Sequence, residues 1–187
     1  MEKSLEAPLR KALFFLEENG YSYAIIGGIA LAQWGVVRAT LDVDIKVLVP
    51  DFNYTVMRTV LRMEFPNTVR EELETHPLIV AVEIDGVNVD FLLALPGYEE
   101  NIVKRAVRRD LNGWNAWICS ADDLVIQKVV AGRGKDWLDI EALLIEQRGQ
   151  LDQVYIHDWL SEFVEALEDP DLLVKYDHLV RNVERLF

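Results

Sequence analysis

Cysteine, long apolar segments and positive charge are all scarce in this sequence. The single cysteine, Cys119, cannot form a disulfide within the chain. No apolar run approaches the roughly 20 residues that a membrane-spanning helix needs. Charged residues interrupt the apolar pattern of residues 1–20, which is not the pattern of a signal peptide. Together these features predict a protein of the reducing cytoplasm.

Basic residues are outnumbered, because 19 Lys and Arg stand against 32 Asp and Glu, and the formal net charge is −13. A protein that coats nucleic acid presents a broad basic field, so this charge argues against that class. It leaves open an enzyme that touches RNA or DNA locally. Residues 104–109 include a basic cluster at helical spacing that could receive RNA, and the alternative is a solvated face.

The order of the expected elements divides the chain in two. Residues 1–119 alternate between strands, expected at 23–26, 43–49, 78–84, 87–93 and 114–119, and helices, expected at 5–18, 29–34, 51–63 and 99–109. Residues 120–187 are expected to be helical at 121–131, 135–147, 156–167 and 172–186. We therefore predict a mixed α/β core in residues 1–119, with a helical C-terminal region, residues 120–187, packed on it.

Two consecutive glycines, Gly27 and Gly28, stand where the first strand gives way to a short helix. Glycine lets a backbone approach a ligand closely, and the start of a helix offers unpaired N–H groups that suit phosphate. The pair is therefore a candidate phosphate site. A tight turn without a ligand is the alternative.

Two carboxylates follow on the next expected strand, at Asp42 and Asp44. Residues two apart on a strand point to the same face, so both side chains should lie together while Val43 faces the core. Two like charges side by side need a positive partner, and hard oxygen ligands favour Mg²⁺ or Mn²⁺. The alternative is a solvated strand face with Lys46 as the partner.

A third carboxylate, Asp90, lies within the apolar run of residues 87–93. A buried carboxylate without a partner is costly. A metal ion shared with Asp42 and Asp44 would be such a partner, and a hydrogen-bonded structural Asp is the alternative.

The order of these features resembles the nucleotidyltransferase fold: a strand, Gly-Gly, a short helix, a strand with D-x-D, and a later strand with one Asp. Residues 26–44 in particular resemble the minimal nucleotidyltransferases of bacteria. Many members of that group carry Ser where Gly28 stands. The resemblance implies an α/β (α+β) fold with a mixed sheet flanked by helices, and a metal-dependent nucleotidyltransferase activity.

A downstream segment, residues 123–140, looks like the K…R.KD..D segment of the AbiEii-type toxin nucleotidyltransferases. In that group the lysine is implicated in binding nucleotide phosphate. The resemblance implies that Lys128 neutralises triphosphate charge, that Arg133 or Lys135 assists, and that Asp136 is an acidic residue of the active site. Asp139 is expected to order the helix. The alternative is a surface helix with a flexible turn.

The implied reaction transfers a nucleoside monophosphate from an NTP to an acceptor hydroxyl of RNA, tRNA included, or of protein. Asp42, Asp44 and Asp90 would hold the Mg²⁺ or Mn²⁺ ions, and Asp90 or Asp136 would take the acceptor's proton. Arg38 joins Lys128 as a candidate contact for the leaving group. An antitoxin-like protein is a possible partner.

Two other readings stay open: transfer to a small molecule such as an aminoglycoside, and a nucleotide-binding or interaction module without turnover.

Overall fold

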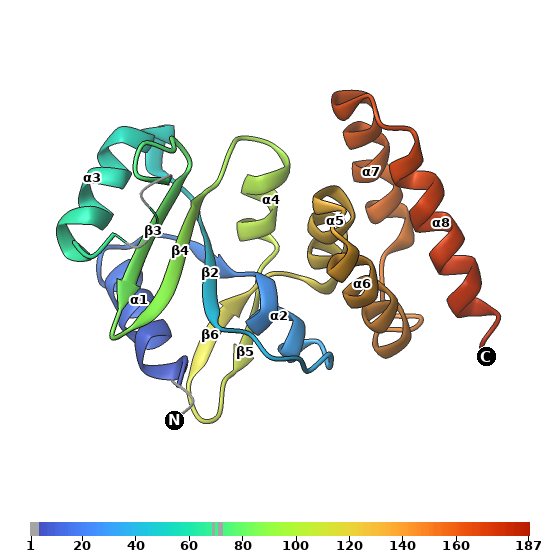
Figure 1. The fold of residues 1–187 in the computed structure, drawn as a ribbon, viewed down its shortest axis with the longest axis horizontal. Coiled ribbons are helices and arrows are strands. Elements are labelled where there is room, and N and C mark those ends of the chain that lie inside the picture. Colours follow the sequence, from blue (N-terminus) through green and yellow to red (C-terminus); the bar gives the residue numbers. More distant parts are fainter. Residues whose placement is uncertain (1–3, 69, 71–72) are drawn as a thin grey trace. The chain divides into compact units, whose positions relative to one another are not determined.

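The computed structural model describes residues 4–68, 70 and 73–187. The chain forms two compact units, one from residues 1–30 and 38–119 and the other from residues 31–37 and 120–187. No helix among the described residues is long and apolar enough to cross a membrane. Figure 1 labels the elements of both units.

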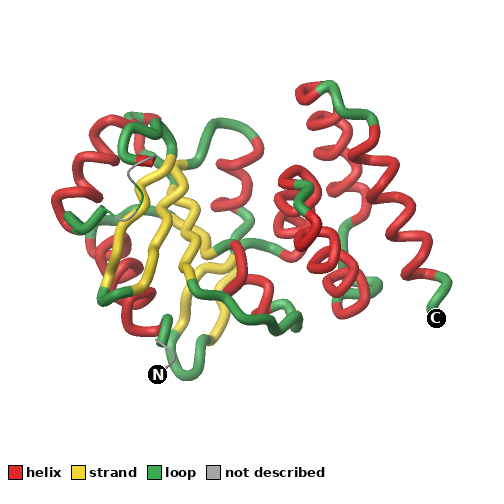
Figure 2. Tube along the Cα trace, in the orientation of Figure 1, coloured by secondary structure: helices red, strands yellow, loops and turns green. Residues whose placement is uncertain are grey.

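A six-stranded mixed sheet forms the centre of the first unit (Figure 2). Its order is β3-β4-β2-β1-β6-β5. The β2–β4 and β1–β6 pairs are parallel, and the other three neighbouring pairs are antiparallel. The strands are β1 (Tyr23–Ile25), β2 (Asp42–Val47), β3 (Ile79–Ile84), β4 (Val87–Leu93), β5 (Val107–Asp110) and β6 (Asn115–Ile118). The predicted mixed α/β fold is confirmed.

The helices of this unit follow from their apolar spacing. In α1 (Glu6–Glu18), Leu9, Leu13 and Leu16 are almost fully buried and recur at helical spacing, so one stripe of the helix packs on β3 and β4. Burying each of these leucines stabilises the fold by roughly 1.5–3 kcal/mol. The other helices are α2 (Gly27–Gln33), which continues into the second unit, the short η1 (Pro50–Phe52), α3 (Tyr54–Glu64) and α4 (Tyr98–Lys104).

Two local predictions for this unit are wrong. The helix expected at 51–63 does not begin at Asp51, which lies inside η1 with a φ of 50°. Asn53 caps α3 instead, by accepting from the Val56 N–H. The helix expected at 99–109 ends at Lys104, and the chain then forms the edge strand β5.

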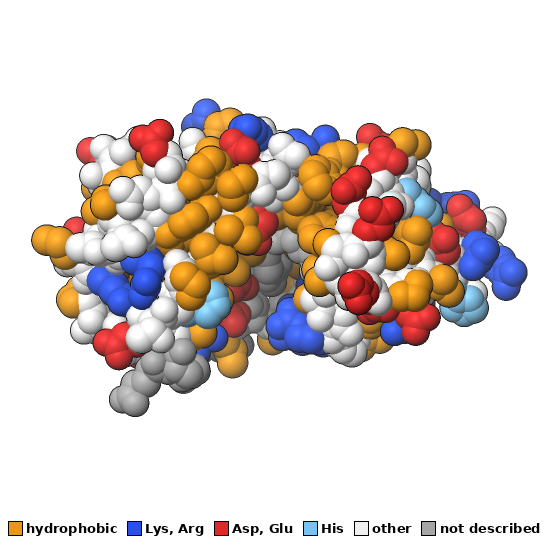
Figure 3. Space-filling model, turned by 90° about the horizontal axis from the view of Figure 1, so that it is seen from above, with side chains coloured by type: hydrophobic (Ala, Val, Ile, Leu, Met, Phe, Trp, Pro, Cys, Tyr) orange, Lys and Arg blue, Asp and Glu red, His pale blue; other side chains and the backbone are white. Residues whose placement is uncertain are grey.

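The second error removes the predicted basic cluster. Arg108 and Arg109 are consecutive residues of β5, so their side chains point to opposite faces of the sheet. Lys104 ends helix α4 instead. On the face drawn in Figure 3, Lys and Arg side chains form small separate groups rather than one continuous basic area.

The second unit is helical, as expected, and consists mainly of α5 (Ala121–Ala131), α6 (Gly134–Glu146), α7 (Gln153–Leu167) and α8 (Asp171–Glu184). Ser120 caps α5 by accepting from the Asp123 N–H, and Gly132 ends it with a φ of 62°. Helix α5 packs on α6 and α7, and α8 packs on both of these. Buried apolar residues from all four helices form the core, among them Leu124, Leu143, Leu160 and Tyr176. The packing of these helices on the α/β core stays a prediction.

Candidate active site

Gly27 is packed directly against the carboxylate of Asp44. Its φ is +66°, and a Cβ at this position would lie 2.1 Å from Asp44 Oδ2. The neighbouring Ile26 N–H donates to the Asp44 carbonyl over 3.0 Å. The turn that follows β1 therefore contacts the N-terminal part of β2, and only glycine fits at position 27.

Gly28 is packed closely against the side chain of Thr40. A Cβ on Gly28 would lie 2.5 Å from Thr40 Oγ1 and 2.7 Å from Thr40 Cβ. Thr40 in turn donates from its hydroxyl to Asp42 Oδ1 over 3.0 Å. The two glycines therefore hold the backbone of the turn against the side chains around the D-x-D pair.

Strand β2 presents Asp42 and Asp44 on one face and buries Val43 and Ile45 completely on the other. Lys46 is the next residue along the carboxylate face. It is only 5% exposed and its ammonium donates to Glu99 Oε1 over 2.7 Å. Lys46 is thus paired with Glu99, which argues against the alternative in which it neutralises the D-x-D pair.

Asp90 is the direct neighbour of Asp44 in the sheet. The parallel register of β2 and β4 pairs Asp44 with Asp90 and Asp42 with Asn88. Paired residues of adjacent strands point to the same face, so the three carboxylates lie on one face, over two neighbouring strands. Asp90 is 9% exposed, and Arg70 donates to its Oδ2.

The other oxygen of Asp90, Oδ1, is buried and has no hydrogen-bond partner among the described residues. A buried carboxylate oxygen without a hydrogen-bond partner is suited to binding a cation, and the hard oxygen donors nearby fit Mg²⁺ or Mn²⁺. No group of three or more His, Cys, Asp or Glu side chains in the described part of the chain is already gathered closely enough to hold an ion. Convergence of Asp42, Asp44 and Asp90 on one shared cation stays a prediction.

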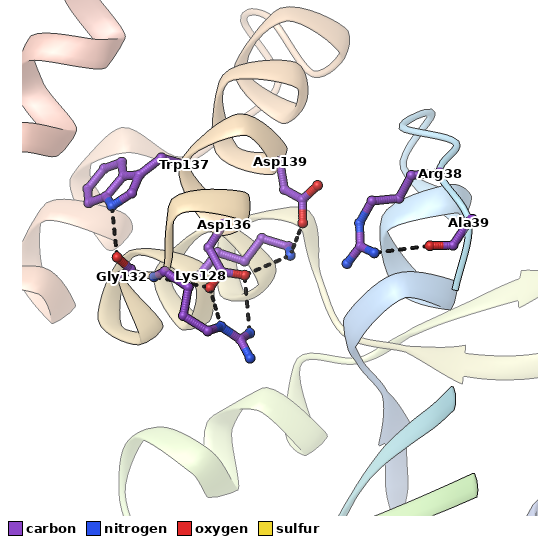
Figure 4. A network of polar contacts seen from close by, with 8 residues as sticks. Arg38, Ala39, Lys128, Gly132, Asp136, Trp137 and Asp139 are labelled. Atoms are coloured by element: carbon purple, nitrogen blue, oxygen red, sulfur yellow. Dashed lines mark hydrogen bonds and ion pairs between the residues drawn. The ribbon is translucent and has the colours of Figure 1, made fainter. Parts of the chain in front are cut away.

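The second unit holds the downstream motif in a buried polar network (Figure 4). Lys128, which is 6% exposed, donates to Asp139 Oδ2 over 2.6 Å and to Asp136 Oδ1 over 3.5 Å. Arg133 holds Asp136 with two of its nitrogens, Nε to Oδ2 at 2.6 Å and Nη2 to Oδ1 at 3.2 Å. The network joins α5 to α6 across the turn at Gly132.

Asp136 is fully buried within this network. Burial alone would raise the pKa of its carboxyl, but the hydrogen bonds and charge of Arg133 and the charge of Lys128 lower the pKa overall. A lowered pKa makes Asp136 a weaker base than an ordinary carboxylate, and its burial shields it, which argues against the predicted role as the group that takes the acceptor's proton. The expectation that Asp139 orders the helix agrees with its contact to Lys128.

Arg38 is exposed, and its guanidinium donates to the Ala39 carbonyl over 3.2 Å. The predicted nucleotide contacts of Arg38, Lys128 and Arg133 stay predictions. Sequence reasoning missed two partners at this site, Arg70 and Glu99. Neither lies in a recognisable motif, because Arg70 is 20 residues from Asp90 and Glu99 is 53 residues from Lys46.

The sheet, the glycine turn and the carboxylates on one face define a nucleotidyltransferase. A family model described as "Nucleotidyltransferase of unknown function (DUF6036)" matches residues 9–184, and the chain belongs to this family. No curated protein has a matching sequence.

Two solved structures of the antibiotic-resistance factor ANT(2'')-Ia share the fold. The solution structure of the antibiotic-resistance factor ANT(2'')-Ia is 17% identical, with a TM-score of 0.61 over 90% of this chain and 97% of that one. The crystal structure of ANT(2'')-Ia with adenylyl-2''-tobramycin is 16% identical, with a TM-score of 0.56 over 83% and 96%. An antigenic nucleotidyltransferase-like protein from Paracoccidioides brasiliensis is 19% identical, with a TM-score of 0.47 over 89% of each chain.

Proposed function

We propose that this protein transfers a nucleoside monophosphate from an NTP to an acceptor hydroxyl in a reaction that depends on Mg²⁺ or Mn²⁺ held by Asp42, Asp44 and Asp90. The observation that carries the proposal is the register of β2 and β4, which pairs Asp44 with Asp90 on one face of the sheet. The contact between Gly27 and the Asp44 carboxylate supports it, because the turn that would receive phosphate touches this pair.

In this reaction the acceptor oxygen attacks the α-phosphorus. A new P–O ester bond forms, the bond to the β-phosphate oxygen breaks, and pyrophosphate leaves with that electron pair. Asp42, Asp44 and Asp90 would hold a divalent ion, which would neutralise charge on the phosphate oxygens. Asp90 is the preferred group to take the acceptor's proton, since it lies beside Asp44 in the sheet whereas Asp136 is fully buried. Gly27 and Gly28 offer close backbone contact to the β- and γ-phosphates.

Arg38, Lys128 and Arg133 are assigned to the triphosphate, as the resemblance to the AbiEii-type toxins implies. For Lys128 this role requires it to loosen its hold on Asp136 or Asp139, because its ammonium donates to both. Alanine variants of Arg38 and Arg133 should raise KM for the NTP more than they lower kcat, if these residues bind the phosphates in the ground state.

The metal site is tested with Asp42→Asn and Asp44→Asn, measured by calorimetric binding of ATP with Mg²⁺. Both variants should lose Mg²⁺-dependent binding while their circular dichroism and unfolding midpoint stay near wild type. Asp85→Asn is the matched control, because it removes the same charge from an exposed turn of the same unit. Wild-type binding in both site variants would refute the assignment.

For the acceptor, we propose the hydroxyl of an RNA or a protein, with an antitoxin-like partner that restrains the activity. This follows the resemblance of residues 123–140 to the toxin group. The test is incubation with labelled ATP, CTP, GTP or UTP, Mg²⁺ and total RNA or cell protein. Label on macromolecules supports this acceptor class.

A cationic small molecule is the second candidate. The net charge of −13 would attract a polycation. The fold is shared with ANT(2'')-Ia, which was solved with adenylyl-2''-tobramycin. Label that appears only on added tobramycin or a similar aminoglycoside would favour this candidate. Tight NTP binding without pyrophosphate release from any mixture would instead indicate a binding module.

A further inference from the structure

The third carboxylate of the site already has a cation, Arg70. This residue lies between the bridge that joins Thr68 to Val82 and the start of β3. Its guanidinium donates to Asp90 Oδ2 and forms an ion pair in which the Asp90 side chain is 12% exposed and the Arg70 side chain 37% exposed. Nothing in the sequence motifs assigns a role to Arg70.

The position of this ion pair is unusual because of its neighbours in the sheet. Asp44 is the register partner of Asp90, so two carboxylates stand side by side on adjacent strands. Such a pair is unfavourable unless a positive charge is near. Lys46 forms its ion pair with Glu99, whereas Arg70 forms an ion pair with Asp90.

We propose that Arg70 occupies the position of a divalent metal ion: its guanidinium neutralises the Asp90 carboxylate in the metal-free protein and competes with the metal for that carboxylate. This inference rests on the proposed function and adds a regulator to the same site. Oδ1 of Asp90 is buried and has no hydrogen-bond partner among the described residues, so it is the oxygen that would bind the metal while Arg70 holds Oδ2. Two cations on one carboxylate repel each other, so each weakens the other's binding.

Competition has a thermodynamic consequence that is independent of turnover. The metal must offset the free energy of the Arg70 ion pair, so removing the guanidinium should tighten metal binding by the corresponding factor. For a partly exposed ion pair this factor is roughly two- to fivefold. A guanidinium that only oriented Asp90 would have the opposite effect, because its loss would disorder a ligand.

The experiment is calorimetric titration of the nucleotide-free full chain with Mn²⁺. Arg70→Gln should bind Mn²⁺ at least about twofold more tightly than wild type. Arg58→Gln is the matched control, since Arg58 lies on α3 of the same unit, carries the same charge and donates to the Glu74 carbonyl rather than to a carboxylate. An equal gain in both variants, no gain, or weaker binding in Arg70→Gln would overturn the proposal.

A second readout and a substitute variant test the same competition. Thermal unfolding with and without Mn²⁺ should show a larger rise in Tm for Arg70→Gln than for wild type. If Arg70→Gln does not fold, Arg70→Lys takes its place and should show a smaller gain, because the lysine ammonium keeps a positive charge beside Asp90. If wild type binds Mn²⁺ and Asp44→Asn does not, a flat Arg70 result refutes this inference alone. Equal binding by Asp44→Asn and wild type refutes the proposed function, and this inference with it.

Discussion

Replacing Gly27 by alanine tests the contact on which the geometry of the site depends. Two separate penalties follow from the structure. The residue has a φ of +66°, a conformation that costs a non-glycine residue roughly 1–2 kcal/mol. The new Cβ would also lie 2.1 Å from Asp44 Oδ2, so the carboxylate or the turn has to move. Overpacking of this kind costs roughly 1–3 kcal/mol.

The expected loss in the free energy of unfolding is therefore roughly 2–5 kcal/mol. Gly20→Ala is the control, because Gly20 has a φ of +69° and nothing within 4 Å of the added Cβ. Gly20→Ala should show the conformational penalty alone, and the difference between the two variants isolates the clash with Asp44. Urea unfolding at constant m-value measures both.

The clash should also appear in metal binding. Displacing the Asp44 carboxylate takes a ligand away from the proposed cation, so Gly27→Ala should bind Mn²⁺ at least tenfold more weakly, whereas Gly20→Ala should bind it like wild type. If the two variants lost equal stability and kept equal Mn²⁺ affinity, the contact between Gly27 and Asp44 would not exist in solution and the reasoning would fail.

Two predictions concern the network that joins α5 to α6. Lys128→Met should lower the free energy of unfolding by about 3–5 kcal/mol, because it leaves the buried carboxylates of Asp136 and Asp139 without their shared cation. Urea unfolding at pH 7 measures this loss. A loss below about 1 kcal/mol would contradict the prediction. Arg133→Gln should show a pH-dependent loss. Arg133 lowers the pKa of Asp136, so its stabilisation is fully present above the unfolded pKa of about 3.9 and disappears as the pH falls through the lower folded value. The difference in urea midpoint between wild type and Arg133→Gln should therefore be large at pH 7 and should shrink as the pH falls below about 3.9, and a constant difference would exclude Asp136 as the group responsible.

Local signals in the sequence account for the elements that were predicted well. Asp85 and Gly86 have φ values of 50° and 81°, as the turn of the β3–β4 hairpin requires, and Ser120 caps α5. The missed strand β5 had a similar signal. Asn112 and Gly113 have φ values of 58° and 95° between β5 and β6, but the charged residues before them favoured a helix in the sequence reading. The reversal of the chain at Asn112 and Gly113 lets residues 107–110 pair with β6 as strand β5.

Strand periodicity predicted which residues of the site share a face, but not which residues they contact. A period of two puts Asp42 and Asp44 on one face, and it requires no knowledge of the partner strand. The partners themselves depend on tertiary packing: Glu99 comes from α4 to Lys46, and Arg70 comes from the segment before β3 to Asp90. The burial of Asp136 likewise depends on the packing of α6 against α5, which no local pattern encodes.

Gly28 illustrates how such a tertiary contact constrains the choice of residue. Many of the nucleotidyltransferases that this sequence resembles carry Ser at this position, and here the space for its Cβ is filled by Thr40, with Oγ1 at 2.5 Å and Cβ at 2.7 Å. Gly28→Ser should therefore cost roughly 1–3 kcal/mol and break the hydrogen bond from Thr40 to Asp42. In a Thr40→Gly background the same change should cost almost nothing, and in a Thr40→Ala background an intermediate amount, because alanine keeps the Cβ. A double-mutant cycle by urea unfolding measures this coupling, and additive effects at the two positions would show that the threonine does not decide which residue position 28 accepts.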